Sequence, residues 1–378
     1  MDFALNIYTA SLLIVVLAII VSTITVVSRR RHEKGSDAEK FNLDRHEQNP
    51  VISPRPHNEW EAQGTFNPAA VTDSQGNIHL LYRSVGADGL SNIGHSKSKD
   101  GFNFNERSSF PIYQPESGTP KANPASEPVV FDPNYYTSGG GWGGFEDPRA
   151  VVIENKVYMT YINFAGWNSV RIGLTSIAMK DLEAGKWNWK KPKLISPANA
   201  VSKNWLLFPE KINGKFVLVH GISPKVLIEY LDNIDDYLQI KEIKSVPQHH
   251  GYGYEDKARE EFWDNRMKGA GPPPLKTDKG WLLLYHALDK RDPGKYKLGA
   301  MILDLKDPSK VLFRSPSPIL EPNVSYENDG KPGVVYATGA IIKDGDLVVY
   351  YGGGDKHVCV AKTPLVQLLD WLVAYGKV

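Results

Sequence analysis

The first candidate for catalysis lies in the stretch SGGGWGGFEDPR, residues 138–149, where a glycine-rich segment leads into two carboxylates, a proline and an arginine. An Asp before Pro often caps its own backbone in a turn, so a purely structural Asp147 is the alternative. Three features favour function. Pro148 fixes the backbone beside the carboxylate, the glycines leave room for a bulky ligand, and the repeats described below place Asp147 beside a channel. We therefore predict that Asp147 is the catalytic carboxylate.

A set of basic residues accompanies this carboxylate along the chain. Most Lys and Arg side chains are solvated surface charges, but Arg83 and Arg171 lie at the ends of apolar strands beside Gly or Ser. Arginine binds phosphate through two parallel hydrogen bonds. We expect these cations to hold inorganic phosphate as a co-substrate, with no further cofactor, although Lys211 is equally able to pair with Glu210. The predicted phosphate-binding residues are Arg83, Arg149, Arg171, Lys203 and Lys211.

The elements that must position these residues are strands, because apolar and polar residues alternate between turns rich in Gly, Pro, Asn and Asp. Five strand pairs resemble one another, and a third strand follows each pair. The pairs span residues 66–84, 146–163, 208–221, 271–287 and 337–353. Repeated four-stranded units are typical of a β-propeller, whereas a plain β-sandwich, the alternative, does not repeat in this way. The predicted fold class is all-β, a five-bladed β-propeller over residues 56–378, preceded by one N-terminal transmembrane helix.

In a propeller, the first strand of each blade lines the central channel, and its start meets the end of the second strand. Polar residues concentrate at these two places, which indicates a site for a polar ligand. The substrate-binding residues predicted from this register are Asn67, Glu210, His220, His286 and Asp355. No H-x-H or H-E-x-x-H pattern accompanies the histidines, so we predict no metal.

Composition excludes several classes of protein. The 378 residues carry 44 basic and 43 acidic side chains, so no net basic field favours nucleic acid. The single cysteine, Cys359, excludes an internal disulfide framework and a cysteine-based zinc site.

The N-terminus departs from globular composition. Residues 3–28 carry no charge, and this length exceeds the ~20 apolar residues that a spanning helix needs. Three arginines follow directly, at 29–31, and basic flanks stay on the cytoplasmic side. We therefore expect residues 1–31 to be a single-pass membrane anchor, 32–55 a tether, and the catalytic domain cytoplasmic; export to the extracytoplasmic side is the alternative.

The ordered motifs FNPAA…LLYR, GFEDPR, KNWLLFPEKINGK, GAGPPPLKTDKGWLLLYHALD and VVYYGGGD…VCVA resemble glycoside hydrolase family 130, from about residue 60 to 372. This resemblance implies a five-bladed propeller and inverting attack of phosphate on a β-mannoside, which gives α-mannose 1-phosphate. It implies that Asp147 is the proton donor, acting through a mannose hydroxyl, and that Asp355 holds the mannose. His220 and Tyr285 match positions near the acceptor. Many members carry His-Arg where this chain has His220-Gly221.

We therefore expect phosphorolysis of a β-mannooligosaccharide or mannosyl-glycan. An inverting hydrolase needs a second carboxylate about 6.5–9.5 Å away to activate water, whereas a phosphorylase needs only the acid and cations for phosphate. The alternatives are an inverting β-mannosidase and a non-catalytic glycan-binding propeller. The sequence leaves the acceptor, the linkage and the oligomeric state open.

Overall fold

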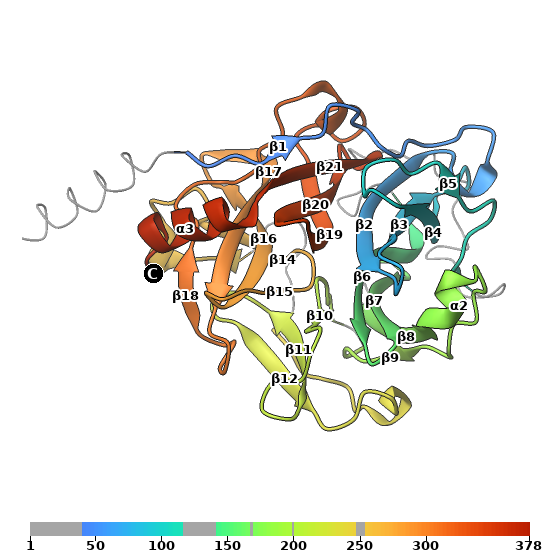
Figure 1. The fold of residues 1–378 in the computed structure, drawn as a ribbon, viewed down its shortest axis with the longest axis horizontal. Coiled ribbons are helices and arrows are strands. Elements are labelled where there is room, and N and C mark those ends of the chain that lie inside the picture. The colour runs from blue at the N-terminus through green and yellow to red at the C-terminus, as the bar shows by residue number, and fades with distance from the viewer. Residues whose placement is uncertain (1–39, 116–140, 167–168, 199, 247–253) are drawn as a thin grey trace, which may run out of the picture. The chain divides into compact units, whose positions relative to one another are not determined.

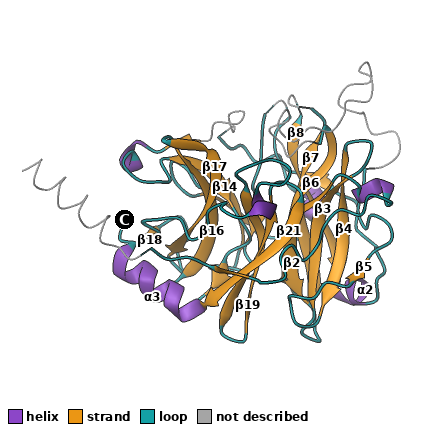
Figure 2. Cartoon of the chain, turned by 90° about the horizontal axis from the view of Figure 1, so that it is seen from above, coloured by secondary structure: helices purple, strands orange, loops and turns teal. Residues whose placement is uncertain are grey.

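The computed structural model describes residues 40–115, 141–166, 169–198, 200–246 and 254–378. The chain divides into two units, Met1–Lys40 and Phe41–Val378, and the second is the globular unit. Strands form most of the regular structure in the described residues, with short helices between them (Figure 2). The predicted all-β character is confirmed.

The largest sheet joins two of the predicted strand groups, in the order β2-β3-β4-β6-β7-β8-β9, with β5 beside β4 (Figure 1). All neighbouring pairs are antiparallel except β4 and β6, which are parallel. The strands are β2 (Gly64–Thr72), β3 (Ile78–Val85), β4 (Leu90–Ser98), β5 (Glu106–Arg107), β6 (Gly143–Ile153), β7 (Lys156–Phe164), β8 (Val170–Ala178) and β9 (Lys193–Leu194).

Glycine makes the parallel junction possible. Leu90 and Ser91 of β4 pair with Gly143 and Gly144 of β6. Gly144 has a φ of +101°, and a Cβ atom there would lie 2.1 Å from the backbone oxygen of Ser91. Only a residue without a side chain allows the two strands to approach so closely.

The third and fourth strand groups form separate antiparallel sheets, in the orders β10-β11-β12 and β13-β14-β16-β17-β18, with β15 beside β16. Their bounds are β10 (Leu206–Leu207), β11 (Phe216–Gly221), β12 (Leu227–Leu231), β13 (Tyr254–Glu255), β14 (Arg266–Ala270), β15 (Leu275–Lys276), β16 (Trp281–Asp289), β17 (Asp292–Leu303) and β18 (Val311–Arg314).

The last strand group forms a four-stranded sheet in the order β1-β21-β20-β19, which includes the beginning of the described chain. Its strands are β1 (Asp44–Arg45), β19 (Val335–Lys343), β20 (Asp346–Gly353) and β21 (His357–Pro364). Leu80 and Tyr82 of β3 share an apolar core with Val348 and Tyr350 of β20. Side-chain packing therefore brings the first and last groups together.

The predicted fold class needs correction here. The sequence indicated five separate four-stranded blades, but hydrogen bonds in the described chain define four sheets, and none of them closes on itself. The repeats reveal the antiparallel groups. They do not reveal which edge strands pair across groups, because that depends on the Gly143–Gly144 approach to β4.

Helices are few and short among the described residues (Figure 2). Helix α3 packs Leu368 and Leu372 into the core between β17 and β20. The helices are α2 (Met179–Glu183) and α3 (Leu365–Tyr375), with single 3₁₀ turns η1 (Glu59–Glu61), η2 (Tyr237–Gln239), η3 (Lys257–Arg259) and η4 (Ser325–Glu327).

The segment from Phe41 to residue 55, assigned above to the tether, belongs to the globular unit. Strand β1 pairs with β21, Leu43 and Ile52 are buried, and Arg45 donates to the buried Glu327 at 2.8 and 2.9 Å. These contacts join residues that are far apart in the sequence. The polar, proline-punctuated composition of the segment therefore did not reveal that it belongs to the folded unit.

No helix within the described residues is long and apolar enough to cross a membrane. This finding corrects the fold class, which included a transmembrane helix, and the predicted single-pass membrane location with a cytoplasmic catalytic domain. The segment on which that prediction rested, residues 3–28, lies outside the described residues.

Candidate active site

Four strands carry an irregularity at an equivalent place near their start. The ladder skips Asn67-Pro68 in β2, Asp147-Pro148 in β6, Lys268 in β14 and Thr338 in β19. Such bulges bend a strand and redirect a side chain. Asn67 and Asp147 have φ values of +47° and +49°, in the left-handed region that Asn and Asp tolerate. Repeated backbone geometry thus presents a polar side chain from each of these strands.

Asp147 is buried, and two neighbouring donors contact its Oδ1 atom. Asn67 donates through Nδ2 to its Oδ1 at 2.8 Å, and Nη1 of Arg83 lies 3.3 Å from the same oxygen. Burial disfavours the charged form, but Arg83 and Arg149 outweigh it, so the pKa of Asp147 lies below its usual value. The carboxylate is therefore ionised in the ligand-free protein at neutral pH.

Arg83 links this carboxylate to its neighbour. Its Nη2 lies 3.0 Å from Oε1 of the fully buried Glu146, and its Nε donates to Oγ of Ser91 at 3.1 Å. The guanidinium also lies 4.8 Å from the centre of the Phe66 ring. Arg83 is thus held rigidly between two carboxylates, which compensate its burial.

Arg149 does not face an open space, because its guanidinium donates hydrogen bonds to three different segments of the chain. Its Nε donates to the oxygen of Gly271 at 2.8 Å, and its Nη2 donates to Oδ1 of Asn204 at 2.9 Å and to the oxygen of Ala270 at 3.1 Å. Its Nη1 donates to the backbone oxygen of Asp147 at 3.0 Å. Every nitrogen of Arg149 has a protein acceptor, so its role here is to position Asp147 by contact and by charge.

Lys331 and Lys203 lie near the carboxylates, and the charges of both act on a third lysine, Lys268. Lys203 and Lys268 line a small cavity with Asn204 and His220. Burial, the charges of Lys203 and Lys331, and that of Arg266 lower the pKa of Lys268 to about 7. Burial also lowers the pKa of Lys203, against the attraction of Glu146 and Asp147. Such mutual repulsion favours an anion that lies between the ammonium groups.

Asp355 supplies a second buried carboxylate, also with a positive φ, of +50°. The ammonium of Lys331 lies 3.8 Å from its Oδ2. Burial raises the pKa of Asp355, opposed by Lys331 and Arg83 and reinforced by Asp147. The environment thus drives the pKa values of Asp147 and Asp355 in opposite directions. We call Asn67, Arg83, Glu146, Asp147, Lys203, Lys268, Lys331 and Asp355 the Asp147 cluster.

The two predicted histidines differ in position. His286 is fully buried, accepts the backbone N–H of Ala337 at 2.9 Å and stacks on Tyr336 at 4.0 Å. Burial and the charge of Arg149 lower its pKa to about 3, so it stays neutral. His220 is hydrogen-bonded through Nδ1 to Oγ of Ser245 at 2.8 Å and lines the cavity beside Lys203.

Three predicted site residues have their contacts elsewhere. Arg171 donates to the oxygen of Ser196 and pairs with Glu242. Lys211 lies 3.6 Å from Glu154 and over the ring of Phe216, and Glu210 pairs with Lys276. Glu210 was predicted to bind substrate from its place at the start of the third strand pair; Asn204, with a φ of +63°, occupies the comparable place before β10.

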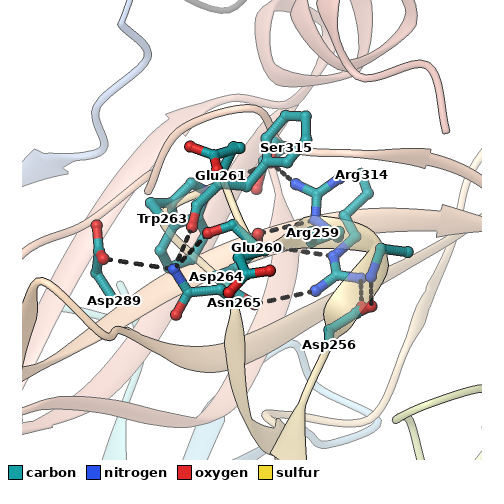
Figure 3. Close-up of polar contacts among 12 residues, drawn as sticks. Asp256, Arg259, Glu260, Glu261, Trp263, Asp264, Asn265, Asp289, Arg314 and Ser315 are labelled. Atoms are coloured by element: carbon teal, nitrogen blue, oxygen red, sulfur yellow. Dashed lines mark hydrogen bonds and ion pairs between the residues drawn. The ribbon is translucent and has the colours of Figure 1, made fainter. Parts of the chain in front are cut away.

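Tyr285 belongs to β16, and its side chain is buried in the core. Its hydroxyl donates to Oδ2 of Asp264 at 2.6 Å. Figure 3 shows the ionic network around Asp264, in which Arg259 and Arg314 donate to its two oxygens at 2.8 and 2.7 Å. Tyr285 therefore anchors the β13–β14 segment, and its hydroxyl contacts Asp264, Ser315 and Arg314.

The family model for glycoside hydrolase family 130, described as beta-1,4-mannooligosaccharide phosphorylase, matches residues 42–374. The chain belongs to glycoside hydrolase family 130. The resemblance inferred from the motifs is thereby confirmed, and with it the prediction that the protein is an enzyme of mannoside metabolism.

Two relatives in Thermoanaerobacter sp. (strain X514) are similar over nearly their whole lengths. A 1,2-beta-oligomannan phosphorylase is 36% identical over 84% of this chain and 96% of its own. A beta-1,2-mannobiose phosphorylase is 33% identical over 85% of this chain and 97% of its own. The solved beta-1,2-mannobiose phosphorylase from Listeria innocua superposes with a TM-score of 0.64, at 23% identity, over 88% of this chain and 100% of that one.

Within this family-130 chain, sequence reasoning missed Lys268, Lys331 and Thr338. A usable signal for Lys268 existed, because the MKGAG stretch around it corresponds to FNPAA and EDPRA in the first two groups. Its bulge becomes evident only from the pairing of β14 with β16. Lys331 lies in the loop after η4, where no repeat pattern reaches.

Proposed function

We propose that this protein catalyses phosphorolysis of β-1,2-mannosides. Family membership supports the reaction, and the two Thermoanaerobacter relatives support this linkage. The observation that carries the proposal for the site is the Asp147 cluster, in which Arg83 and Lys331 contact three buried carboxylates and the charges of Lys203 and Lys268 act at the same place. Inorganic phosphate, as a further anion, compensates the remaining positive charge of this cluster.

In the proposed reaction, a phosphate oxygen attacks the anomeric carbon while the bond from that carbon to the glycosidic oxygen breaks. Asp147 delivers a proton to the departing oxygen through a mannose hydroxyl, and phosphate attacks from the opposite face, which gives α-mannose 1-phosphate and a shortened sugar. Because phosphate is already a nucleophile, no carboxylate base is required. Lys203 and Lys268 are the proposed phosphate ligands, with Arg83 fixed behind them.

Charge coupling explains how Asp147 obtains its proton. In the ligand-free protein, cations hold its pKa below the usual value. A phosphate dianion offsets those cations, so the pKa of Asp147 rises when the co-substrate binds. Asp147 then carries a proton when the nucleophile is in place, which couples acid catalysis to phosphate binding.

The test is a product assay with β-1,2-mannobiose and β-1,4-mannobiose, each with and without phosphate. We expect mannose 1-phosphate only with phosphate, and faster turnover of the β-1,2 substrate. Equal sugar release without phosphate would identify a hydrolase, with Asp355 as the carboxylate to examine. Asp147→Asn should lower kcat by at least about 100-fold, the scale of general acid catalysis, whereas the exposed Asp278→Asn should not.

A further inference from the structure

A second cavity lies at the other end of β3 from the Asp147 cluster. It has a volume of about 340 Å³ and is lined by residues of β3, β4, β5 and α2, among them His79, His95, Lys97, Glu106 and Trp187. Arg83 belongs to the cluster, and His79 precedes it by four residues on the same strand, a distance of about 13 Å at the usual rise of a strand. Figure 1 shows β4, β5 and α2 together at one side of the globular unit.

Buried hydrogen bonds fix the base of this cavity. Asp73 accepts N–H groups from Gln75 and Asn77, and its Oδ2 lies 3.1 Å from Nε2 of His79. The Nδ1 atom of His79 lies 2.9 Å from Nε2 of His95. An ionised carboxylate only accepts, so Nε2 of His79 donates to it, and Nδ1 of His79 must accept from His95. The Nδ1 atom of His95 is thereby left as a hydrogen-bond acceptor.

This arrangement keeps His95 neutral. It is 8% exposed, and burial, together with the neighbouring His79 and the charge of Lys97, lowers its pKa to about 3. The Nδ1 atom of the neutral imidazole can therefore accept a hydrogen bond from a hydroxyl group of a ligand. Because the ring carries no charge, it does not attract an anion.

The walls supply an aromatic face and charges of both signs. The ring of Trp187 lies 4.7 Å from that of His95, and the tryptophan is partly exposed. Lys97 and Glu106 face each other in the β4–β5 ladder, and Lys97 forms no ion pair with any described residue. Glu183 also lines the cavity, and its Oε1 atom already accepts a hydrogen bond from the hydroxyl of Ser74. Balanced charge beside an indole ring suits a neutral, hydroxyl-rich ligand.

We propose that this cavity is a second carbohydrate-binding site, which holds a sugar unit of a β-mannan chain away from the Asp147 cluster. Trp187 covers the apolar face of the sugar ring, and Lys97, Glu106 and His95 bind its hydroxyl groups. The identity of the sugar rests on the proposed function, whereas the existence of the site is inferred from the cavity and from the buried hydrogen bonds at its base. Such a site raises the local concentration of long substrates and leaves disaccharides unaffected.

The experiment uses the full chain carrying Asp147→Asn, titrated calorimetrically with β-1,2-mannotetraose and with β-1,4-mannotetraose. We expect two binding events for one of these probes. Addition of Trp187→Ala should remove one event or weaken it at least tenfold, and Lys97→Ala should weaken it severalfold. The matched control is Lys99→Ala, on the exposed residue two positions along the same segment. A single event in the parent, or two unchanged events in a folded Trp187→Ala variant, would overturn the proposal.

Kinetics of otherwise unaltered protein separate this proposal from the proposed function. Trp187→Ala should raise KM for a β-mannan chain long enough to reach both sites and leave kcat/KM for the disaccharide unchanged. A protein that turns over no mannoside but still binds the tetraose in a Trp187-dependent way would refute the function and retain the site. If both proteins turn over this long chain with the same KM, the second site is refuted and the proposed function is retained.

Discussion

The side-chain amide of Asn67 lies 2.8 Å from Oδ1 of Asp147, although 80 residues separate them in the sequence. Both residues stand at bulges with nearly equal positive φ values, on strands that contact each other, β2 and β6. One strand group thus positions the carboxylate of the next. The hydrogen bond from Asn67 therefore holds the proposed catalytic acid in position.

Asn67→Ala should lower kcat/KM roughly 10- to 100-fold, because a hydrogen bond to a charged group contributes about 1.5–3 kcal/mol. The loss should also raise the pKa of Asp147, since that hydrogen bond favours the carboxylate. Steady-state kinetics across pH test both effects. Asn188→Ala, on an exposed residue, is the control; equal activity of the two variants would contradict a positioning role.

Arg83→Met should lower the free energy of unfolding by about 3–5 kcal/mol, because it leaves Glu146 and Asp147 buried without their cation. Denaturant unfolding measures the change. Arg171→Met is the matched comparison: its partner Glu242 is half exposed, so we expect a loss within about 1 kcal/mol and an unchanged KM for phosphate. A large effect of Arg171→Met on phosphate KM would restore the original prediction.

Lys268 makes phosphate binding depend on pH near neutrality. Its pKa, lowered to about 7, means that the ammonium charge is present below pH 7 and is lost above it. The KM for phosphate should therefore rise from pH 6 to pH 8.5. Lys268→Gln should raise KM severalfold at pH 6 and flatten this dependence, whereas Lys276→Gln, on the β15 surface, should follow the parent. Parallel profiles for Lys268→Gln and the parent would exclude a phosphate contact.

Gly144→Ala should destabilise the protein by more than about 2 kcal/mol, because the new Cβ meets the Ser91 oxygen at 2.1 Å and the positive φ is strained. Gly76→Ala is the control, since its φ of +83° is also positive but no atom lies within 4 Å of the added Cβ. Its cost should stay near 1–2 kcal/mol. Thermal unfolding of the two variants compares them directly, and equal costs would mean that the β4–β6 junction adjusts freely.

Sequence reasoning succeeded where a local pattern reports a local property. Alternation and turn residues identified the five antiparallel groups, and the motif EDPR singled out Asp147, whose catalytic role stays a prediction. It failed for Arg171, Lys211 and Glu210, because each lies near a strand end in sequence but is paired outside the cluster. Tyr285 failed for a similar reason: its hydroxyl is turned toward Asp264 in the core.

By itself, the sequence determined the all-β character, the family and the near balance of charge, since these depend on composition, periodicity and motifs. Tertiary structure alone decided that β4 and β6 share one sheet, that residues from Phe41 on complete the last sheet, and that Lys331 lies beside Asp355 and close enough to Lys268 to affect its charge. The physical reason is that strand bulges and edge pairing set the direction of each side chain. The bulges and the edge pairing depend on contacts between residues that are distant along the chain. A local sequence pattern contains no information on such contacts.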